Sequence, residues 1–334
     1  MELSTEERIE RLSLGISAVR IRLSKFNPNH VPSGPKGGQF ASGSERNYAP
    51  KSMKRVPSTA TSVEPTGEAK VLLDSVKESA ARQDASYRAW KEASENYAKA
   101  SGKEADALKS EIEKQLSLNK ASGQEVRDVF TKQFSGGTVG KLAPSMDKSF
   151  HPDVKEEIEK GFADFNNTFG NVGLKSVKVV AASPNERPYY DSKTNTMHVP
   201  NNAGNPMCDA SVIIHELGHA VHHSSKVSND KIVGKWFDTR VGEFEQPKSL
   251  AKIYPGQGWP RDEVAYPDKF MDAYMGKVYT RTAWSGDRAF HEEVKGREIP
   301  SMGMELLYKS PYKLAKSDPD MFNFLMKYLD KARR

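Results

Sequence analysis

The run SVIIHELGHAVHH at residues 211–223 constrains the chain more than any other segment, because it carries the pattern His-Glu-x-x-His in apolar surroundings. His215 and His219 are four positions apart, close to one helical turn, so both imidazoles project from one face. Two neutral imidazoles placed in this way can share one Zn²⁺. Glu216 is rotated away from them, where it can act as a base toward a metal-bound water. The pattern therefore predicts a helix with two zinc ligands and a catalytic glutamate.

A second interpretation is that these residues form the polar face of a buried helix without a metal. The positions around them are apolar: Val212, Ile213, Ile214, Leu217, Ala220 and Val221. Such a helix is buried, and ionisable groups in it are costly unless they are paired or bind a metal. We therefore favour zinc binding. His222 and His223 follow the second ligand, and we interpret them as groups at the solvated end of the helix or behind the ligands.

The composition excludes several classes of protein. Of the 334 residues, 37% are hydrophobic. No stretch of about 18 apolar residues occurs, so we expect no contact with a membrane. The N-terminus lacks an apolar signal core and the single cysteine, Cys208, excludes an internal disulfide, which predicts a cytoplasmic location in the producing cell. The net charge of +6 permits contact with nucleic acid, but no other feature supports it, so we expect none.

Changes in composition divide the chain into three parts. Residues 1–66 are rich in Gly, Pro, Ser and basic residues, which predicts a flexible, disordered N-terminal region. Residues 67–141 carry apolar side chains at three- and four-residue steps, which predicts a helical region. Within it we expect Gly102 to divide a helical hairpin and residues 124–134 to form a further helix. Residues 142–334 contain the His-Glu-x-x-His run and are the expected catalytic domain.

The expected catalytic domain mixes helix and strand patterns. An apolar stripe at helical spacing begins after Pro152 and predicts a core helix. Residues 177–182 predict a buried strand, and residues 189–200 predict a hairpin whose second arm is 196–199. His198 would then be a strand residue and not a metal ligand. The predicted fold class is α+β, with an active-site helix against a small sheet.

A catalytic zinc ion normally takes a third protein ligand and leaves one position to water. The residues directly after His219 do not supply a histidine at the spacing of a third ligand, which leaves glutamates of a later helix. Glu298 and Glu305 are seven residues apart on nearly the same helical face, and both are candidates. We expect whichever of them is not a ligand to hold a zinc histidine from behind. Glu292 and Glu293 are weaker candidates, because adjacent charges favour a solvated turn.

Residues 150–330 resemble the zincin-like metallopeptidases of phages and bacterial toxins, which are gluzincin-type domains distantly similar to anthrax lethal factor and to thermolysin-type enzymes. In that family the third ligand opens a Glu-x-x-Ala/Ser string on a helix, and Glu298-Ile-Pro-Ser301 fits this string. The resemblance implies a zincin-like fold, Glu298 as the third zinc ligand, and an edge strand that holds a protein or peptide substrate. Metal-assisted hydrolysis also requires a group that stabilises the oxyanion near the metal, and Tyr279 and His291 are candidates.

A second resemblance lies near the N-terminus. The strings Asn27-Pro-Asn-His-Val-Pro-Ser-Gly34 and Gly37-Gly-Gln-Phe-Ala41 are similar to a short motif of phage and prophage proteins, often encoded near head-morphogenesis genes. This motif implies phage head or portal proteins as partners.

Together the two resemblances predict a phage- or prophage-encoded zinc endopeptidase, made in the cytoplasm and then carried in the virion or delivered into a target cell. One alternative is a toxin effector metalloprotease that is delivered to competitor or host cells. The other is a catalytically silent head or injected protein that keeps a zincin fold.

Overall fold

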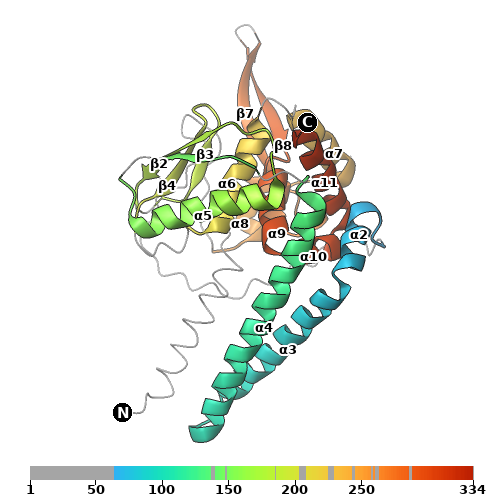
Figure 1. Ribbon diagram of the computed structural model, residues 1–334. Helices are drawn as coiled ribbons and strands as arrows, with labels where there is room; N and C mark the ends of the chain where they lie inside the picture. Colours follow the sequence, from blue (N-terminus) through green and yellow to red (C-terminus); the bar gives the residue numbers. More distant parts are fainter. Residues whose placement is uncertain are drawn as a thin grey trace. The chain divides into compact units, whose positions relative to one another are not determined.

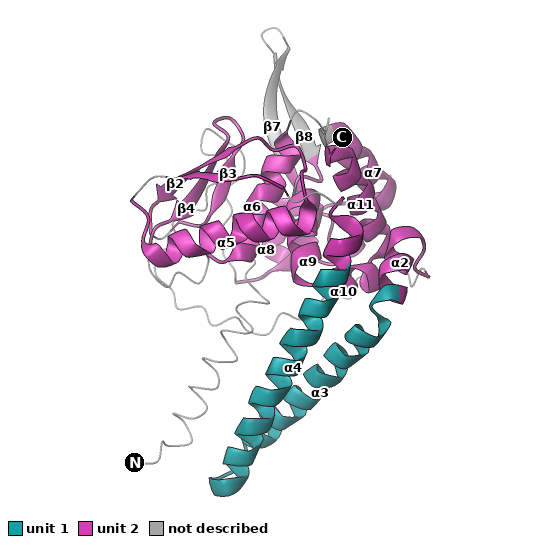
Figure 2. Ribbon diagram, viewed as in Figure 1, with its two compact units in different colours: residues 1–27, 75–129 teal, residues 28–74, 130–334 magenta. Residues whose placement is uncertain are grey.

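The structure is a computed structural model (Figure 1). It describes residues 64–136, 140–146, 149–184, 186–202, 208–224, 229–242, 245–256, 259, 263–285 and 288–333, without the side chains of 229–230 and 280–294. These residues form two compact units, Ser75–Val129 and residues 64–74 with 130–333 (Figure 2). The phage-type motif and nearly all of the predicted flexible region 1–66 lie outside the described residues. The predicted division after residues 66 and 141 stays a prediction.

The first unit is a helical hairpin. Helix α3 (Lys77–Tyr97) and helix α4 (Gly102–Phe134) are separated by a short connection, so the predicted break at Gly102 is confirmed. Small side chains supply many of its buried positions: Ala80, Ser86, Ala93, Ala105 and Ser122. The Asn119 side chain donates a hydrogen bond to the carbonyl oxygen of Gln83 over 3.0 Å. The hairpin is therefore closed by small residues and a cross-helix hydrogen bond.

The predicted separate helix at residues 124–134 was wrong, because α4 continues through Gly123 without a break. A Cβ atom at Gly123 would lie 2.8 Å from the Gln83 amide nitrogen of α3. Gly123 therefore lies against the Gln83 side chain and does not end a helix. The last residues of α4, from Phe130 onward, belong to the second unit, where the Phe130 ring lies 6.2 Å from the Phe322 ring.

The second unit contains a four-stranded sheet with the order β1-β2-β4-β3. Strands β1 (Pro144–Met146), β2 (Val177–Ala182) and β4 (Thr196–Pro200) are parallel, whereas β3 (Tyr189–Asp191) is antiparallel at the edge. The predicted strand at 177–182 and the predicted hairpin are confirmed. Helix α5 (Pro152–Phe169) is the predicted core helix, and its buried stripe is Val154, Ile158, Phe162, Phe165 and Phe169.

Helix α6 (Ala210–His223) is the centre of this unit and packs against α5 and against α9 (Glu298–Lys309). The short helix α10 (Pro311–Ser317) and the amphipathic helix α11 (Pro319–Arg333) follow α9 and contact it. Apolar residues of α11 are fully buried: Met321, Phe322, Leu325 and Leu329. The small sheet with its helices confirms an α+β fold class.

A second sheet, with the order β5-β6-β7-β8, was not predicted. Its strands are β5 (Lys248–Ser249), β6 (Val264–Ala265), β7 (Lys277–Ser285) and β8 (Arg288–Lys295), and all neighbours are antiparallel. Strand β8 carries Glu292 and Glu293, so the solvated turn expected there was wrong. Threonine and aromatic residues along β7 favour a strand, but β5 and β6 are too short to leave a periodic signal.

Helix α2 (Gly67–Ser75) precedes α3 in the chain. The elements between α6 and β7 that remain are α7 (Asn229–Val241), α8 (Leu250–Ile253) and the 3₁₀ turns η1 (Pro267–Lys269) and η2 (Ala273–Gly276). Arg240 of α7 pairs with the buried Asp318 carboxylate, with 2.8 Å between Nη1 and Oδ1. This buried pair joins α7 to the start of α11. Among the described helices, none has the length and apolar character needed to span a membrane.

Candidate metal centre

Helix α6 begins at a well-formed cap. The Asp209 carboxylate accepts hydrogen bonds from the backbone N–H groups of Ser211 and Val212, over 3.0 and 3.1 Å. Such a cap satisfies donors that otherwise have no partner at a helix start. The apolar residues that follow bury most of the helix, as predicted. His215 and His219 are partly exposed one turn apart, on the side of α6 that faces α9.

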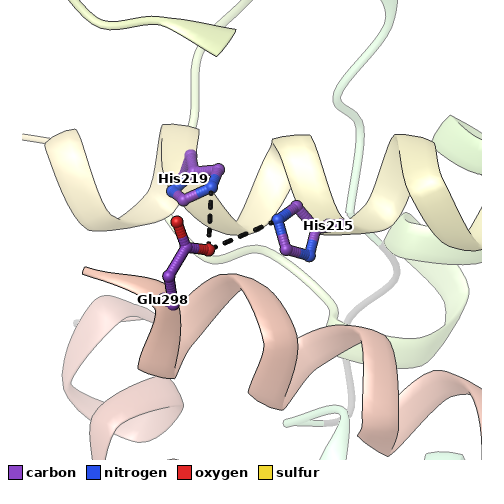
Figure 3. A group of neighbouring side chains, drawn as sticks. All are labelled: His215, His219 and Glu298. Carbon is purple, nitrogen blue, oxygen red and sulfur yellow. Dashed lines mark ion pairs between the residues drawn. The ribbon is translucent and has the colours of Figure 1, made fainter. Parts of the chain in front are cut away.

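Glu298 completes a group of three possible metal ligands (Figure 3). Its Oε2 atom lies 3.5 Å from Nε2 of His215 and 3.5 Å from Nε2 of His219. These distances are long for hydrogen bonds. Ligand atoms that surround one zinc ion tetrahedrally, at about 2.0–2.2 Å from it, lie about 3.3–3.6 Å apart. The two distances to Glu298 fit donors to one shared ion, and the possible ligand atoms of all three residues lie within 4.8 Å of one another.

Glu298 is the first residue of α9 and its side chain is fully buried, with an exposed fraction of 0%. An isolated carboxylate in such a position is costly. Ser301, one helical turn on, donates its hydroxyl to Oε2 over 3.0 Å, and the Tyr279 hydroxyl donates to Oε1. The structure thus places Glu298, and not Glu305, beside both Nε2 atoms. Tyr279, a predicted oxyanion partner, instead contacts the candidate ligand.

Glu305 lies behind His215. Its Oε2 atom is 3.1 Å from His215 Nδ1, and Lys309 donates to its Oε1 atom over 2.9 Å. Burial alone would raise the pKa of Glu305, but Lys309 and His215 outweigh it and lower that pKa to about 2. A carboxylate on Nδ1 favours a proton there, which leaves Nε2 of His215 free to accept a metal. This is the arrangement expected for the glutamate that is not a ligand.

His219 and Glu216 are both shifted by burial. Burial lowers the pKa of His219 to about 3, so its imidazole is neutral, the form that binds a metal. Burial raises the pKa of Glu216 to about 7, and its side chain is 6% exposed. The backbone N–H of Tyr190, in the edge strand β3, donates a hydrogen bond to Glu216. The Glu216 carboxyl of α6 therefore lies against the edge strand β3.

Arg187 is a residue of the site that the sequence analysis missed. It precedes β3, and burial lowers the pKa of its guanidinium to about 10. Tyr274, Glu216, Glu305 and Glu298 interact with it electrostatically and oppose this shift. The sequence offered no signal beyond an arginine before the predicted hairpin. The structure brings a positive charge into the field of the candidate catalytic carboxylates.

The other predicted positions lie away from the three-residue group. His223 is exposed as expected for the solvated end of α6, but His222 is buried, with 2% exposed. His198 lies on β4 as predicted, with its ring stacked on Tyr189 at 4.3 Å. Cys208 is buried and, as the single cysteine of the sequence, forms no internal disulfide. The side chains of His291, Glu292 and Glu293 are outside the described residues, so their roles stay predictions.

Gly218 allows α9 to approach α6. A Cβ atom at this position would lie 2.6 Å from the Ser301 Cα and 3.2 Å from the Pro300 carbonyl oxygen. Both atoms belong to the first turn of α9, the turn that begins with Glu298. The glycine inside the His-Glu-x-x-His pattern is therefore required to bring Glu298 to the two histidines.

Gly218→Ala is expected to lower the free energy of unfolding by about 1–3 kcal/mol, the usual cost of overpacking. Helix propensity alone predicts the opposite, because alanine is favoured over glycine by about 1 kcal/mol. The matched control is Gly234→Ala in α7, where a Cβ atom meets nothing within 4 Å. Denaturant unfolding of both variants tests the contact. If neither variant is less stable than the parent, the contact between Gly218 and the first turn of α9 does not require a glycine.

Comparison with known proteins adds no assignment: no family model, no curated protein and no solved structure matches this chain. The resemblance to zincin-like metallopeptidases therefore depends on the residues quoted above. A functional conclusion has to come from the arrangement of side chains in the site.

Proposed function

We propose that the protein is a zinc-dependent hydrolase that cleaves peptide bonds. The observation that carries this proposal is the group of His215, His219 and Glu298, in which one carboxylate oxygen lies 3.5 Å from both Nε2 atoms. Two histidines and one carboxylate are a common ligand set of catalytic zinc, which leaves a fourth position for water. Buried acidic side chains and a neutral imidazole suit zinc better than the all-oxygen sites of calcium or magnesium.

The surroundings of the group support a zincin-like arrangement. The metal helix α6 packs against α5 and contacts the edge strand β3. In the sheet of the described residues, β3 pairs with β4 on one side only, and its Tyr190 backbone N–H reaches Glu216. An edge strand next to a catalytic carboxyl can bind an extended peptide by strand addition. This placement supports a protein or peptide substrate over a small molecule.

Zinc, when bound, supplies a Lewis acid that makes water nucleophilic near neutral pH and polarises a carbonyl group. Glu216 takes the proton of the attacking water and returns it to the leaving amine. A pKa of about 7 allows the same carboxyl to do both near neutral pH. Arg187 brings a positive charge that can stabilise negative charge developing on the substrate oxygen. Glu305 keeps His215 in the tautomer that presents Nε2.

The resemblance of residues 27–41 to a phage motif supports a phage or prophage origin, with head or portal proteins as partners. A toxin effector would use the same site and differ only in its delivery. Neighbouring genes distinguish the two, since capsid and portal genes favour a virion protein, whereas immunity and secretion genes favour a toxin. The presence of Glu216 beside the three-residue ligand group argues against a silent zincin fold.

Metal analysis combined with a proteomic cleavage screen tests the proposal. We expect about one zinc ion per chain, because the three donors can surround a single ion. His215→Ala and His219→Ala should each lose zinc and all cleavage. His223→Ala, at the exposed end of the same helix, is the matched control and should keep both. Full zinc retention in both histidine variants would contradict the assignment.

A further inference from the structure

The two oxygens of Glu298 have different surroundings. Oε2 faces both imidazoles at 3.5 Å and accepts the Ser301 hydroxyl over 3.0 Å. Oε1 accepts the hydroxyl of Tyr279. A carboxylate can bind a metal through one oxygen or through both. The Tyr279 hydrogen bond occupies the oxygen that would otherwise be available as a second ligand atom.

Tyr279 is itself held by a second tyrosine. The Tyr274 hydroxyl donates to the Tyr279 hydroxyl, and both side chains are buried. The Tyr279 hydroxyl donates its single proton to Glu298, so it can only accept the hydrogen bond that joins it to Tyr274. The result is a directed chain of hydrogen bonds from Tyr274 through Tyr279 to the far oxygen of Glu298.

A buried ion pair fixes the two rings. The Lys277 ammonium is 2.9 Å from Glu263 Oε2, and the two side chains are only 1% and 2% exposed. The same ammonium lies 4.7 Å from the centre of the Tyr279 ring, 5.1 Å from that of Tyr274 and 5.5 Å from that of Trp259. A desolvated cation against aromatic faces is strongly attracted to them. Displacing either tyrosine would remove a contact from a buried charge, which is costly.

We infer that Tyr279 is a positioning residue that would hold Glu298 as a one-oxygen ligand, because it keeps Oε1 in a hydrogen bond while Oε2 faces the two imidazoles. Tyr274 and the Lys277–Glu263 pair hold the Tyr279 ring in place behind it. This inference rests on the metal site of the proposed function but not on its peptide substrate. Groups behind a metal ligand orient it and tune its affinity, and their loss costs about 10–100-fold in metal binding.

Tyr279→Phe removes only the hydroxyl and tests the inference directly. We expect the zinc affinity, measured by competition with a chromophoric chelator, to fall by about 10–100-fold. We also expect the visible spectrum of the cobalt-substituted protein to change, because the freed Oε1 can enter the coordination sphere. The matched control is Tyr308→Phe, which removes a tyrosine hydroxyl bonded to the Asp164 carboxylate over 2.6 Å, on the same helix as Glu298. It should keep the parent's affinity and spectrum.

The outcomes separate this inference from the proposed function. Parent-like zinc affinity and cobalt spectrum in Tyr279→Phe would overturn the inference alone. A parent protein that binds no zinc would overturn both. A parent that binds zinc but cleaves no peptide would overturn the peptidase and leave the inference standing. If Tyr279→Phe fails to fold, Tyr274→Phe is the test. A smaller loss of zinc affinity together with a change in the cobalt spectrum would support the hydrogen-bond chain from Tyr274 to Glu298. Zinc affinity and a cobalt spectrum like the parent's would overturn the inference.

Discussion

Glu216→Gln is expected to lower peptide cleavage by about 10²–10⁴-fold, the usual contribution of a general base. Glutamine has nearly the same shape as glutamate but cannot take a proton from water. Its amide oxygen can still accept the Tyr190 N–H, so the contact between α6 and β3 is kept. Glu216 lies outside the three-residue ligand group, so zinc binding should stay at the parent's level. The loss should therefore appear in kcat without a loss of metal.

The measurement is kcat and KM on a peptide from the cleavage screen, together with the zinc content of each sample. Glu159→Gln is the matched control, because Glu159 is an exposed residue of α5 that pairs with Lys155 over 3.6 Å, one helical turn away. It should cleave as fast as the parent. If Glu216→Gln cleaves at the parent's rate with zinc bound, a different group is the base and the proposed mechanism is wrong.

The local features of the site could be predicted from the sequence because they depend on helical spacing. His215 and His219 share a face through the four-residue step, and the apolar neighbours that bury α6 are adjacent in the chain. The Glu-x-x-Ser string also has a local cause. Ser301 lies one turn after Glu298, and its hydroxyl reaches the carboxylate. Gly218, in the middle of the pattern, allows the close contact between α6 and α9.

Features that depend on long-range contacts could not be predicted. The strands β5 and β6 have two residues each, so the second sheet exists through pairing with β7 and not through a periodic pattern. Tyr279 reaches Glu298 from that sheet. The sequence divided the helical region before residue 124, whereas α4 runs from Gly102 to Phe134 through Gly123. The cost of one glycine in a helix interior is only about 1 kcal/mol, which the rest of a helix of this length can offset.

Glu298→Gln and Glu305→Gln are expected to separate the ligand from the group behind it. Both substitutions conserve shape, so neither leaves a cavity at these buried positions, and each removes one negative charge. Glu298→Gln should lose zinc and cleavage together, because its Oε2 atom is the one that faces both imidazoles. The loss in zinc affinity should exceed the roughly 10–100-fold typical of residues behind a ligand.

Glu305→Gln should keep zinc bound when the metal is saturating, with affinity lower by about 10–100-fold. The amide oxygen of glutamine can still accept from His215 Nδ1, the atom now 3.1 Å from Glu305. The two glutamates also have different hydrogen-bond partners. Glu305 accepts from the charged Lys309, whereas Glu298 accepts from the neutral hydroxyls of Tyr279 and Ser301. The measurement is a zinc titration of both proteins. If Glu305→Gln releases the metal while Glu298→Gln retains it, Glu305 is the third ligand. The zincin-like interpretation would then still hold, but the inferred role of Tyr279 would be wrong, because it depends on Glu298 as the ligand.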